Sequence, residues 1–233
     1  MKNKLIYFML IALAISACSQ KGPIKNVKLK TATDSASYAI GVIVGVQNNY
    51  TIESVPGGEE INLEIMSAAF RKASVKEETK MTIEEAYEYI QIYFEGIGQR
   101  QAQKNLEEGN AFLEKNKSRA GVQVTASGLQ YEIITEGTGE KPRAEDQVRA
   151  HYHGTIISGE VFDSSVERGE PVVFPVSGEM IMGWTEALQL MPVGGKWKFY
   201  MPSYLAYGEQ DRGGMIGPNT VLIFEIELLE IIK

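Results

Sequence analysis

The spacing of apolar residues changes once along this chain, near residue 127, and divides it into a helical part and a sheet-forming part. Between residues 34 and 117, apolar side chains recur at steps of three and four, the period of an amphipathic helix. Beyond Ser127 and Gly128 they alternate with polar side chains, which is the period of a strand with one buried face. We therefore expect helices first and a half-buried antiparallel sheet afterwards.

Two short helices are expected before residue 75. The first starts with Asp34 as its N-cap, although the β-branched run 42–44 also fits a strand, and the second follows Asn62. Their periodic apolar residues are Ala36, Ala39, Ile40, Ile43 and Val46 in the first, and Leu63, Met66, Ala69, Phe70 and Ala73 in the second. Two helices of this length close little core between them, so they need further partners.

The third helix has the clearest start of the three. Thr82 and Glu85 form a capping box, and the pattern runs without proline to about Asn116. A break at Gly96 or Gly109 into two shorter helices is the alternative, since a glycine costs a helix about 1 kcal/mol.

The two halves of this third helix differ in their apolar content. The first half is apolar on more than one side, whereas only Ala102 and Leu106 are apolar between residues 99 and 110. This contrast predicts a packed portion followed by a solvated stalk. A second copy of the chain would supply the missing core, so we expect a symmetric homodimer; a compact monomeric helical cap is the alternative.

The sheet-forming part contains several alternating segments and one helix. The segments 148–153, 196–201 and 222–228 each place apolar residues on one face and polar residues on the other. A single short helix fits between them; it carries Trp184 and is ended by Pro192. These elements predict an α+β fold, in which a curved antiparallel sheet wraps on one short helix.

The first residues have the pattern of an export signal. Two lysines precede an apolar run at 5–15 that is too short for a permanent membrane helix. The sequence ISAC, ending at Cys18, resembles the bacterial lipobox, in which the cysteine is lipidated. We therefore expect a signal peptide at 1–17, a lipidated flexible tether at 18–33, and a protein anchored in the cell envelope, on the outer membrane facing the periplasm. A plain secretory signal with an incidental cysteine is the alternative.

Composition narrows the classes of partner. The formal charge is −7 and the pI about 5.1, which argues against nucleic acid as a partner. One cysteine excludes an intrachain disulfide and a cysteine-based metal cluster. His151 and His153 share a strand face but lack a third ligand, so we expect no metal site. No cofactor motif is present in the sequence.

Six motifs occur in the sheet-forming part in a fixed order. They are HYHG (151–154), VFDSS (161–165), GWTEAL (183–188), MPVGGKWKFYMP (191–202), LAYG (205–208) and PNTVLIFEIELL (218–229). In this order they resemble the FK506-binding-protein (FKBP) type peptidyl-prolyl cis-trans isomerases across 127–233.

The helical part resembles the Mip/FkpA subgroup of exported bacterial isomerases. The resemblance lies in SYAIGVIVG (37–45), NLEEGNAFLEKN (105–116) and TASGLQYEIITEGTG (125–139). It implies a helical dimerisation domain with a stalk at 34–117, a linker at 118–126 and an isomerase domain at 127–233. In that subgroup the helices of two chains intertwine.

The resemblance also implies roles for individual residues. Trp184 forms the floor under the substrate proline, Asp163 lies near the substrate amide, and Tyr207 donates to a substrate carbonyl. Arg168 pairs with Asp163. The residues implied to surround the proline are Tyr152, Phe162, Met180, Ile181, Ile216 and Phe224. Outside this motif context, the aromatic members would be ordinary core residues.

Three features depart from the family pattern. Val172 stands where many members have a pocket phenylalanine, and the segment 178–180 is shorter by one residue. The loop 209–216 carries Arg212 and two glycines where a histidine is often found. These departures bear on substrate preference and inhibitor affinity more than on activity.

We therefore expect a peptidyl-prolyl cis-trans isomerase that assists the folding of exported proteins in the cell envelope. It would stabilise a twisted X-Pro amide without covalent chemistry, and FK506-like macrolides would inhibit it. Its substrates would be proline-containing unfolded or partly folded proteins. A holdase-type periplasmic chaperone with incidental isomerase activity is the alternative, and an envelope spacer with an inactive domain is a third hypothesis.

Overall fold

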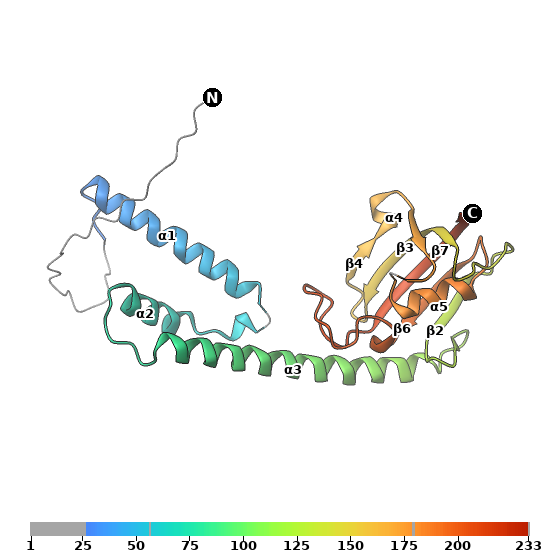
Figure 1. Cartoon of the computed structure of the whole chain (residues 1–233), viewed down its shortest axis with the longest axis horizontal. Coiled ribbons are helices and arrows are strands. Elements are labelled where there is room, and N and C mark those ends of the chain that lie inside the picture. Colours follow the sequence, from blue (N-terminus) through green and yellow to red (C-terminus); the bar gives the residue numbers. More distant parts are fainter. Residues whose placement is uncertain (1–26, 56, 179, 233) are drawn as a thin grey trace, which may run out of the picture. The chain divides into compact units, whose positions relative to one another are not determined.

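The protein is described here by a computed structural model that covers residues 27–55, 57–178 and 180–232 and divides into two units, 1–54 and 55–233 (Figure 1). The predicted signal peptide and Cys18 lie outside the described residues. Among the described residues, no helix is both long and apolar enough to cross a membrane.

The first unit contains helix α1 (Ala32–Glu53), which starts earlier than predicted. Thr31 is the N-cap, and Asp34 completes a capping box from the third helical position. The Thr31 hydroxyl accepts from the Asp34 amide at 3.1 Å, and the Asp34 carboxylate accepts from the Thr31 amide at 2.9 Å. The run 42–44 is helical, so the strand alternative is wrong. None of the residues of α1 is buried.

The second unit begins with the short turn η1 (Gly58–Glu60), followed by α2 (Leu63–Ser74) and α3 (Ile83–Asn116). Asn62 caps α2, and a Thr82–Glu85 capping box starts α3, as predicted. Helix α3 is continuous through its glycines, so the alternative of a break is wrong.

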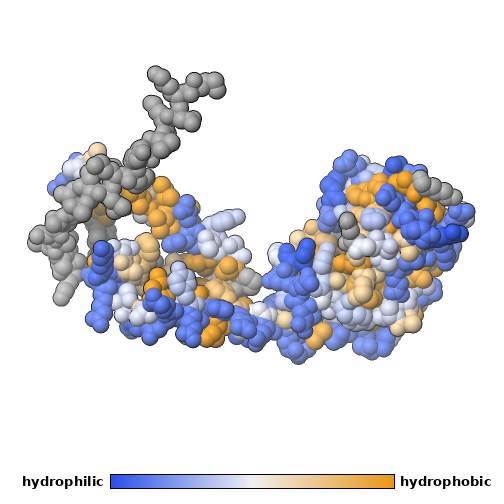
Figure 2. All heavy atoms as spheres, viewed as in Figure 1, coloured by the Kyte–Doolittle hydropathy of each residue, from blue (hydrophilic) through white to orange (hydrophobic). Residues whose placement is uncertain are grey.

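The helical part leaves an unusual amount of apolar side chain in contact with solvent, and Figure 2 shows apolar residues in orange at its surface. Helix α2 buries no residue, and Ile97 is the first buried residue of α3. Large side chains more than half exposed are Tyr38, Ile40, Ile43, Val46 and Tyr50 in α1, Ile65 in α2, and Ile83, Tyr87, Tyr89 and Ile92 in α3. Within one chain these helices lack a core of their own.

The C-terminal part is a twisted antiparallel sheet with one helix of more than two turns against it. Its strands are β1 (Gln123–Val124), β2 (Gln130–Thr135), β3 (Gln147–Ile156), β4 (Val161–Ser164), β5 (Val172–Pro175), β6 (Lys196–Met201) and β7 (Leu222–Ile232). Their order is β1-β2-β6-β7-β3-β4, and β5 also pairs with β3. The helices are α4 (Ser165–Arg168), α5 (Met182–Leu190) and the short turn η2 (Ser203–Leu205).

The core of this part lies between the sheet and α5. Alternate residues of β3 are buried, and Leu188 and Met191 pack against Phe199 and Ile226 of the central strands. This arrangement follows from the period of two in the strands, which gives each a buried and a solvated face. It places side chains of β3, β4 and α5 together on one side of the sheet, where the candidate site lies.

The end of α3 packs directly on the sheet. Leu113 shares a second buried cluster with Tyr200, Val221 and Ile223. The segment 118–126, predicted as a linker, contains β1, which pairs with β2. One face of the last two turns of the predicted stalk, with Gly109, Leu113 and Asn116, is therefore buried against the sheet-forming part of the chain.

Candidate functional site

Trp184 lies at the centre of a group of aromatic rings contributed by four elements. Its side chain, on α5, is 2% exposed. The ring centroid lies 5.6 Å from that of Tyr152 on β3 and 5.3 Å from that of Phe224 on β7, both edge-on at 84°. Phe174, on β5, lies closer, at 4.8 Å. Edge-to-face contacts have a preferred geometry, and they stabilise a ring pair beyond the burial of its apolar area.

Phe162 completes this aromatic cluster, which we define as Tyr152, Phe162, Phe174, Trp184 and Phe224. Its ring meets Phe224 edge-on at 5.4 Å. The ring lies over Gly154, where an added Cβ would come within 2.7 Å of the Phe162 Cζ atom. The glycine of the HYHG motif is thus needed for space: it lets the rings of two neighbouring strands approach the backbone of β3.

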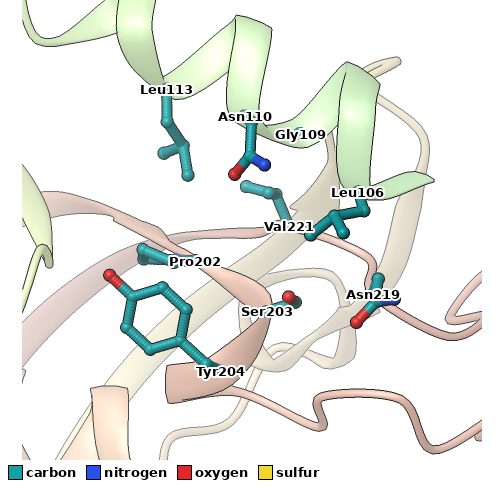
Figure 3. A pocket seen from close by; sticks show the side chains of 9 residues that line it. All are labelled: Leu106, Gly109, Asn110, Leu113, Pro202, Ser203, Tyr204, Asn219 and Val221. Carbon is teal, nitrogen blue, oxygen red and sulfur yellow. The ribbon is translucent and has the colours of Figure 1, made fainter. Parts of the chain in front are cut away.

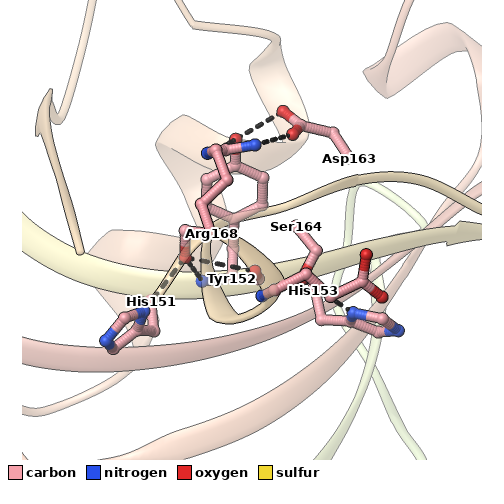
Figure 4. Close-up of polar contacts among 8 residues, drawn as sticks. His151, Tyr152, His153, Asp163, Ser164 and Arg168 are labelled. Atoms are coloured by element: carbon pink, nitrogen blue, oxygen red, sulfur yellow. Dashed lines mark hydrogen bonds and ion pairs between the residues drawn. The ribbon is translucent and has the colours of Figure 1, made fainter. Parts of the chain in front are cut away.

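A polar triad of Tyr152, Asp163 and Arg168 shares Tyr152 with the aromatic cluster, and Figure 4 shows the contacts of the triad. The Tyr152 hydroxyl and the Arg168 guanidinium both donate to the carboxylate of Asp163, each to a different oxygen. Arg168 also donates to the Tyr152 hydroxyl oxygen at 2.8 Å, and its guanidinium lies 5.6 Å from the centre of the Tyr152 ring. The predicted pairing of Arg168 with Asp163 is present in the structure.

The triad holds its members in defined protonation states. Burial raises the pKa of Asp163, but the hydrogen bonds from Tyr152 and Arg168 outweigh it, so the net pKa is below its usual value. Burial, together with the hydrogen bond to Asp163, raises the pKa of Tyr152. The pKa of Arg168 is raised chiefly by its hydrogen bond to Asp163. Near neutral pH the site therefore holds a carboxylate, a neutral phenol and a guanidinium.

Two serines after Asp163 fasten β4 and α4 to β3. The buried Ser165 hydroxyl accepts from the Tyr152 amide at 2.8 Å, and it lies 3.1 Å from the His151 Nδ1. Ser164 contacts the His153 Nδ1 at 3.0 Å (Figure 4). Each histidine therefore has a serine partner, and among the described residues no group of three possible ligands surrounds a metal position.

The other predicted site residues pack around the same cluster. Met180, Ile181, Tyr207, Ile216 and Val172 are half-buried and lie against the main core. The Arg212 guanidinium lies 5.0 Å from the centre of the Tyr207 ring.

Two sequence families together cover most of the chain. Residues 138–229 match the family described as FKBP-type peptidyl-prolyl cis-trans isomerase, and residues 33–133 match the domain amino terminal to it. A protein of Aeromonas hydrophila, named FKBP-type peptidyl-prolyl cis-trans isomerase FkpA, is 41% identical over 214 residues, which are 88% of this chain and 78% of that protein. The chain belongs to the FKBP-type peptidyl-prolyl cis-trans isomerases.

Two further relatives place this isomerase with Mip and FkpA. The outer membrane protein MIP of Legionella longbeachae is 37% identical over 240 residues, covering 100% of this chain and 99% of that protein. The crystal structure of FkpA from Escherichia coli superimposes with a TM-score of 0.68 at 31% identity, covering 88% of this chain and 98% of that one. The predicted family, enzyme class and fold class are confirmed.

Phe174 is a member of the aromatic cluster that the sequence motifs did not identify. The sequence places Val172 where many family members have a pocket phenylalanine. In the register of β5 against β3, Phe174 faces Val148 and Val172 faces Ala150, so both side chains lie on the same face of the strand. The ring of Phe174 reaches Trp184 and Tyr152 from the position two residues on. The period of two within VVFP was the signal that identifies it.

Proposed function

We propose that the substrate proline of this isomerase binds against the aromatic cluster, with the Trp184 indole beneath the pyrrolidine ring. The observation that carries the proposal is the meeting of Trp184 with three other rings directly beside the Asp163–Arg168–Tyr152 triad. Phe162 and Phe224 would form the walls. The side chains of Val172, Met180, Ile181 and Ile216 would form the apolar rim.

The chemistry required is rotation about the X-Pro amide, with no bond broken. The barrier is about 18–20 kcal/mol because rotation removes amide resonance. A twisted amide is less dipolar than a planar one, so an apolar site favours it relative to water. The Tyr207 hydroxyl would donate to a substrate carbonyl, and the fixed Asp163 carboxylate would face the amide. Neither group acts as a nucleophile, and the step needs no cofactor.

The substrates we propose are proline-containing unfolded or partly folded proteins. Uncatalysed X-Pro isomerisation takes tens to hundreds of seconds, which is slow enough to limit their folding. FK506-like macrolides would compete for the same apolar site.

The competing function, a holdase, is favoured by the exposed apolar side chains of α1 to α3. The test compares turnover of a proline-containing peptide with suppression of client aggregation, each with and without a saturating FK506-like macrolide. We expect the saturating macrolide to abolish peptide turnover, because it would occupy the site that binds the substrate proline. Peptide turnover that survives the macrolide would contradict the proposed site. Aggregation suppression that survives it would assign a separate holdase role to the helices.

We also propose that the helical part, 34–117, forms a homodimer. Neither α1 nor α2 buries any residue in one chain, and α1 is apolar on several sides, which is typical of a helix inside a core. A second copy is the simplest source of that core. The match of residues 33–133 to a domain found before FKBP isomerases supports a conserved role for these helices.

The proposed location is the cell envelope, with lipid on Cys18 as the anchor. Support comes from the export-signal pattern at 1–17 and from the ISAC sequence. The relative of Legionella longbeachae is named as an outer membrane protein. Labelling with a radioactive fatty acid, lost in a Cys18→Ser variant, would establish the anchor.

The pKa of Asp163 is lowered and that of Tyr152 is raised, so neither group changes its protonation state between about pH 5 and pH 9. We therefore expect kcat/KM to stay constant over this pH range. The lowered pKa of Asp163 means that its stabilising contribution is present above the ordinary value near 3.9 and is lost as pH falls through the lower folded value. The raised pKa of Tyr152 means that its contribution is present below the ordinary value near 10 and is lost as pH rises through the higher folded value.

The measurement is kcat/KM for a proline peptide from pH 3 to 11, in the wild type and in Asp163→Asn. The asparagine variant should lose the acid limb, because it has no carboxylate to protonate. Asp146→Asn, which lies outside the triad and accepts only from a local backbone amide, is the matched control and should keep it. A profile with a single midpoint near pH 7 would contradict the assignment of the triad.

A further inference from the structure

The stalk helix α3 is hydrogen-bonded to the base of a loop beside the proposed site. This loop, residues 208–220, follows Tyr207, carries Ile216 and leads into β7. The Asn105 amide of α3 donates to the Pro218 carbonyl oxygen at 2.7 Å and approaches the Thr220 hydroxyl at 3.4 Å. In the other direction, the Asn219 amide donates to the Ala102 carbonyl at 3.3 Å. Both contacts join residues more than a hundred positions apart.

The same short stretch of chain closes the loop on itself. The Asn219 backbone amide donates to the Gly208 carbonyl at 2.7 Å, so the two ends of the loop are joined where α3 touches them. Asn219 has a φ of 58°, a left-handed conformation that few residues other than glycine and asparagine adopt readily. A contact from outside the loop helps to hold such a conformation. The Asn105 amide is placed to supply it, since it donates to the carbonyl of the preceding residue.

The helix also approaches the loop base more closely than a side chain on its near face would permit. An added Cβ at Gly109 would lie 2.7 Å from a Val221 methyl group. The space left between α3 and the sheet is a cavity of about 20 Å³ beside Gly109, Asn219 and Val221 (Figure 3). A volume near that of one water position admits no peptide. Helix α3 and the base of the loop are therefore in direct contact.

The helix is a firm support for the loop because its last turns are bound to the sheet. Asn116 is 2% exposed and donates to Gln130 at 2.9 Å. Gln130 in turn donates to the Leu113 carbonyl at 3.0 Å. Arg119 bridges Asn116 and the Tyr200 hydroxyl, at 2.8 and 3.0 Å. Asn105 thus projects from a helix whose position is fixed against β2 and β6.

We propose that Asn105 is a positioning residue for the isomerase: it holds the 208–220 loop so that Tyr207 and Ile216 stand over the bound proline. The inference rests on the proposed function of the aromatic cluster. It makes the stalk a part of the site as well as a spacer, although Asn105 itself touches no substrate.

This role predicts a particular kinetic change. A released loop spends only a fraction of its time in the arrangement that binds substrate, and apparent affinity falls by that fraction. The KM for a proline peptide should rise by about three- to tenfold while kcat stays within about twofold, because a neutral hydrogen bond is worth on the order of a fivefold change in an equilibrium. A merely destabilising change would instead lower the fraction of active enzyme, and so reduce kcat at constant KM.

The test uses the full chain with Asn105→Asp, which keeps the shape of the side chain but replaces its donor with an acceptor facing the Pro218 carbonyl. Gln103→Glu is the matched control, because the Gln103 amide donates only within the helix, to Glu107. Steady-state kinetics are combined with amide hydrogen exchange. We expect Asn105→Asp to raise KM and to speed exchange at the amides of Arg212, Ile216 and Asn219, with β6 and β7 unchanged. The control should alter neither.

Unchanged loop exchange in Asn105→Asp would overturn the inference, and so would faster exchange with an unchanged KM. Trp184→Ala, measured in parallel, distinguishes this failure from failure of the proposed function. Wild-type kinetics in Trp184→Ala would contradict the proposed site itself. A loss of activity there, with unchanged KM in Asn105→Asp, would contradict only the role of the stalk.

Discussion

Trp184→Ala is expected to lower kcat/KM for a proline-containing peptide by about 100-fold, equivalent to roughly 2.7 kcal/mol of transition-state stabilisation. The indole is the proposed contact surface for the proline ring. It also orients Tyr152 and Phe224 through edge contacts and Phe174 through a tilted contact. Truncating a buried tryptophan also costs about 3–5 kcal/mol of folding free energy. Because typical domains are stable by only 5–15 kcal/mol, the unfolding free energy must be measured on the same preparation.

Trp184→Phe avoids most of this loss of stability. It keeps an aromatic floor of smaller area, so we expect a fall in kcat/KM of about tenfold, or roughly 1.4 kcal/mol. Trp197→Phe is the matched control. Trp197, on β6, is 4% exposed. Its ring stacks on Tyr131 at 5.1 Å and on Phe199 at 6.1 Å, and neither of these residues belongs to the aromatic cluster. It should lose comparable stability without loss of turnover.

The Trp197→Phe variant also allows ligand binding to be measured directly. The chain has two tryptophans, so Trp197→Phe leaves Trp184 as the only indole. Its fluorescence should change on titration with a proline peptide or with an FK506-like macrolide. Full turnover in Trp184→Ala, or a fluorescence that no proline ligand alters, would show that the proline binds elsewhere.

The helices could be predicted because their ends have local signals. The capping box of Thr82 and Glu85 depends on residues three apart, and the structure contains it. The predicted start of α1 was three residues too late. Asp34 is a residue type that often caps a helix, but here it occupies the third helical position behind the N-cap Thr31. Spacing alone does not tell these two positions of the box apart. The strand faces of β3 were predictable because the period of two is also local.

The site was only partly predictable, because its contacts join distant segments. Motif order led to Tyr152, Asp163 and Trp184, and the structure brings them together. Phe174 was missed because a substitution at Val172 is compensated two residues later, which only the register of β5 makes visible. The Asn105 contact has no local signal, since Asn105 and Pro218 are 113 residues apart. The motif NLEEGNAFLEKN, which begins at Asn105, indicates the end of the stalk helix and does not indicate the loop that Asn105 contacts.

Ile43→Glu in α1 is expected to convert the protein from dimer to monomer at micromolar concentration. Ile43 is 56% exposed in one chain and lies on a helical face with Val46 and Tyr50, at spacings of three and seven. A carboxylate placed unpaired in a dimer core costs several kcal/mol, and two-fold symmetry introduces it twice. Dimer affinity should fall by at least about 1,000-fold, or roughly 4 kcal/mol.

The measurement is mass in solution by light scattering, on protein lacking the predicted signal peptide, over a range of concentrations. Lys104→Glu is the control, since it places the same side chain on the exposed portion of α3 and should leave the dimer intact. Peptide turnover should stay within about twofold of wild type in both variants, because the aromatic cluster belongs to a separate core in the other unit. A wild type that runs as a monomer would contradict the proposed pairing, and so would a dimer unaffected by Ile43→Glu. In either case the apolar side chains of α1 would need another partner, and a holdase surface would become the better explanation of their exposure.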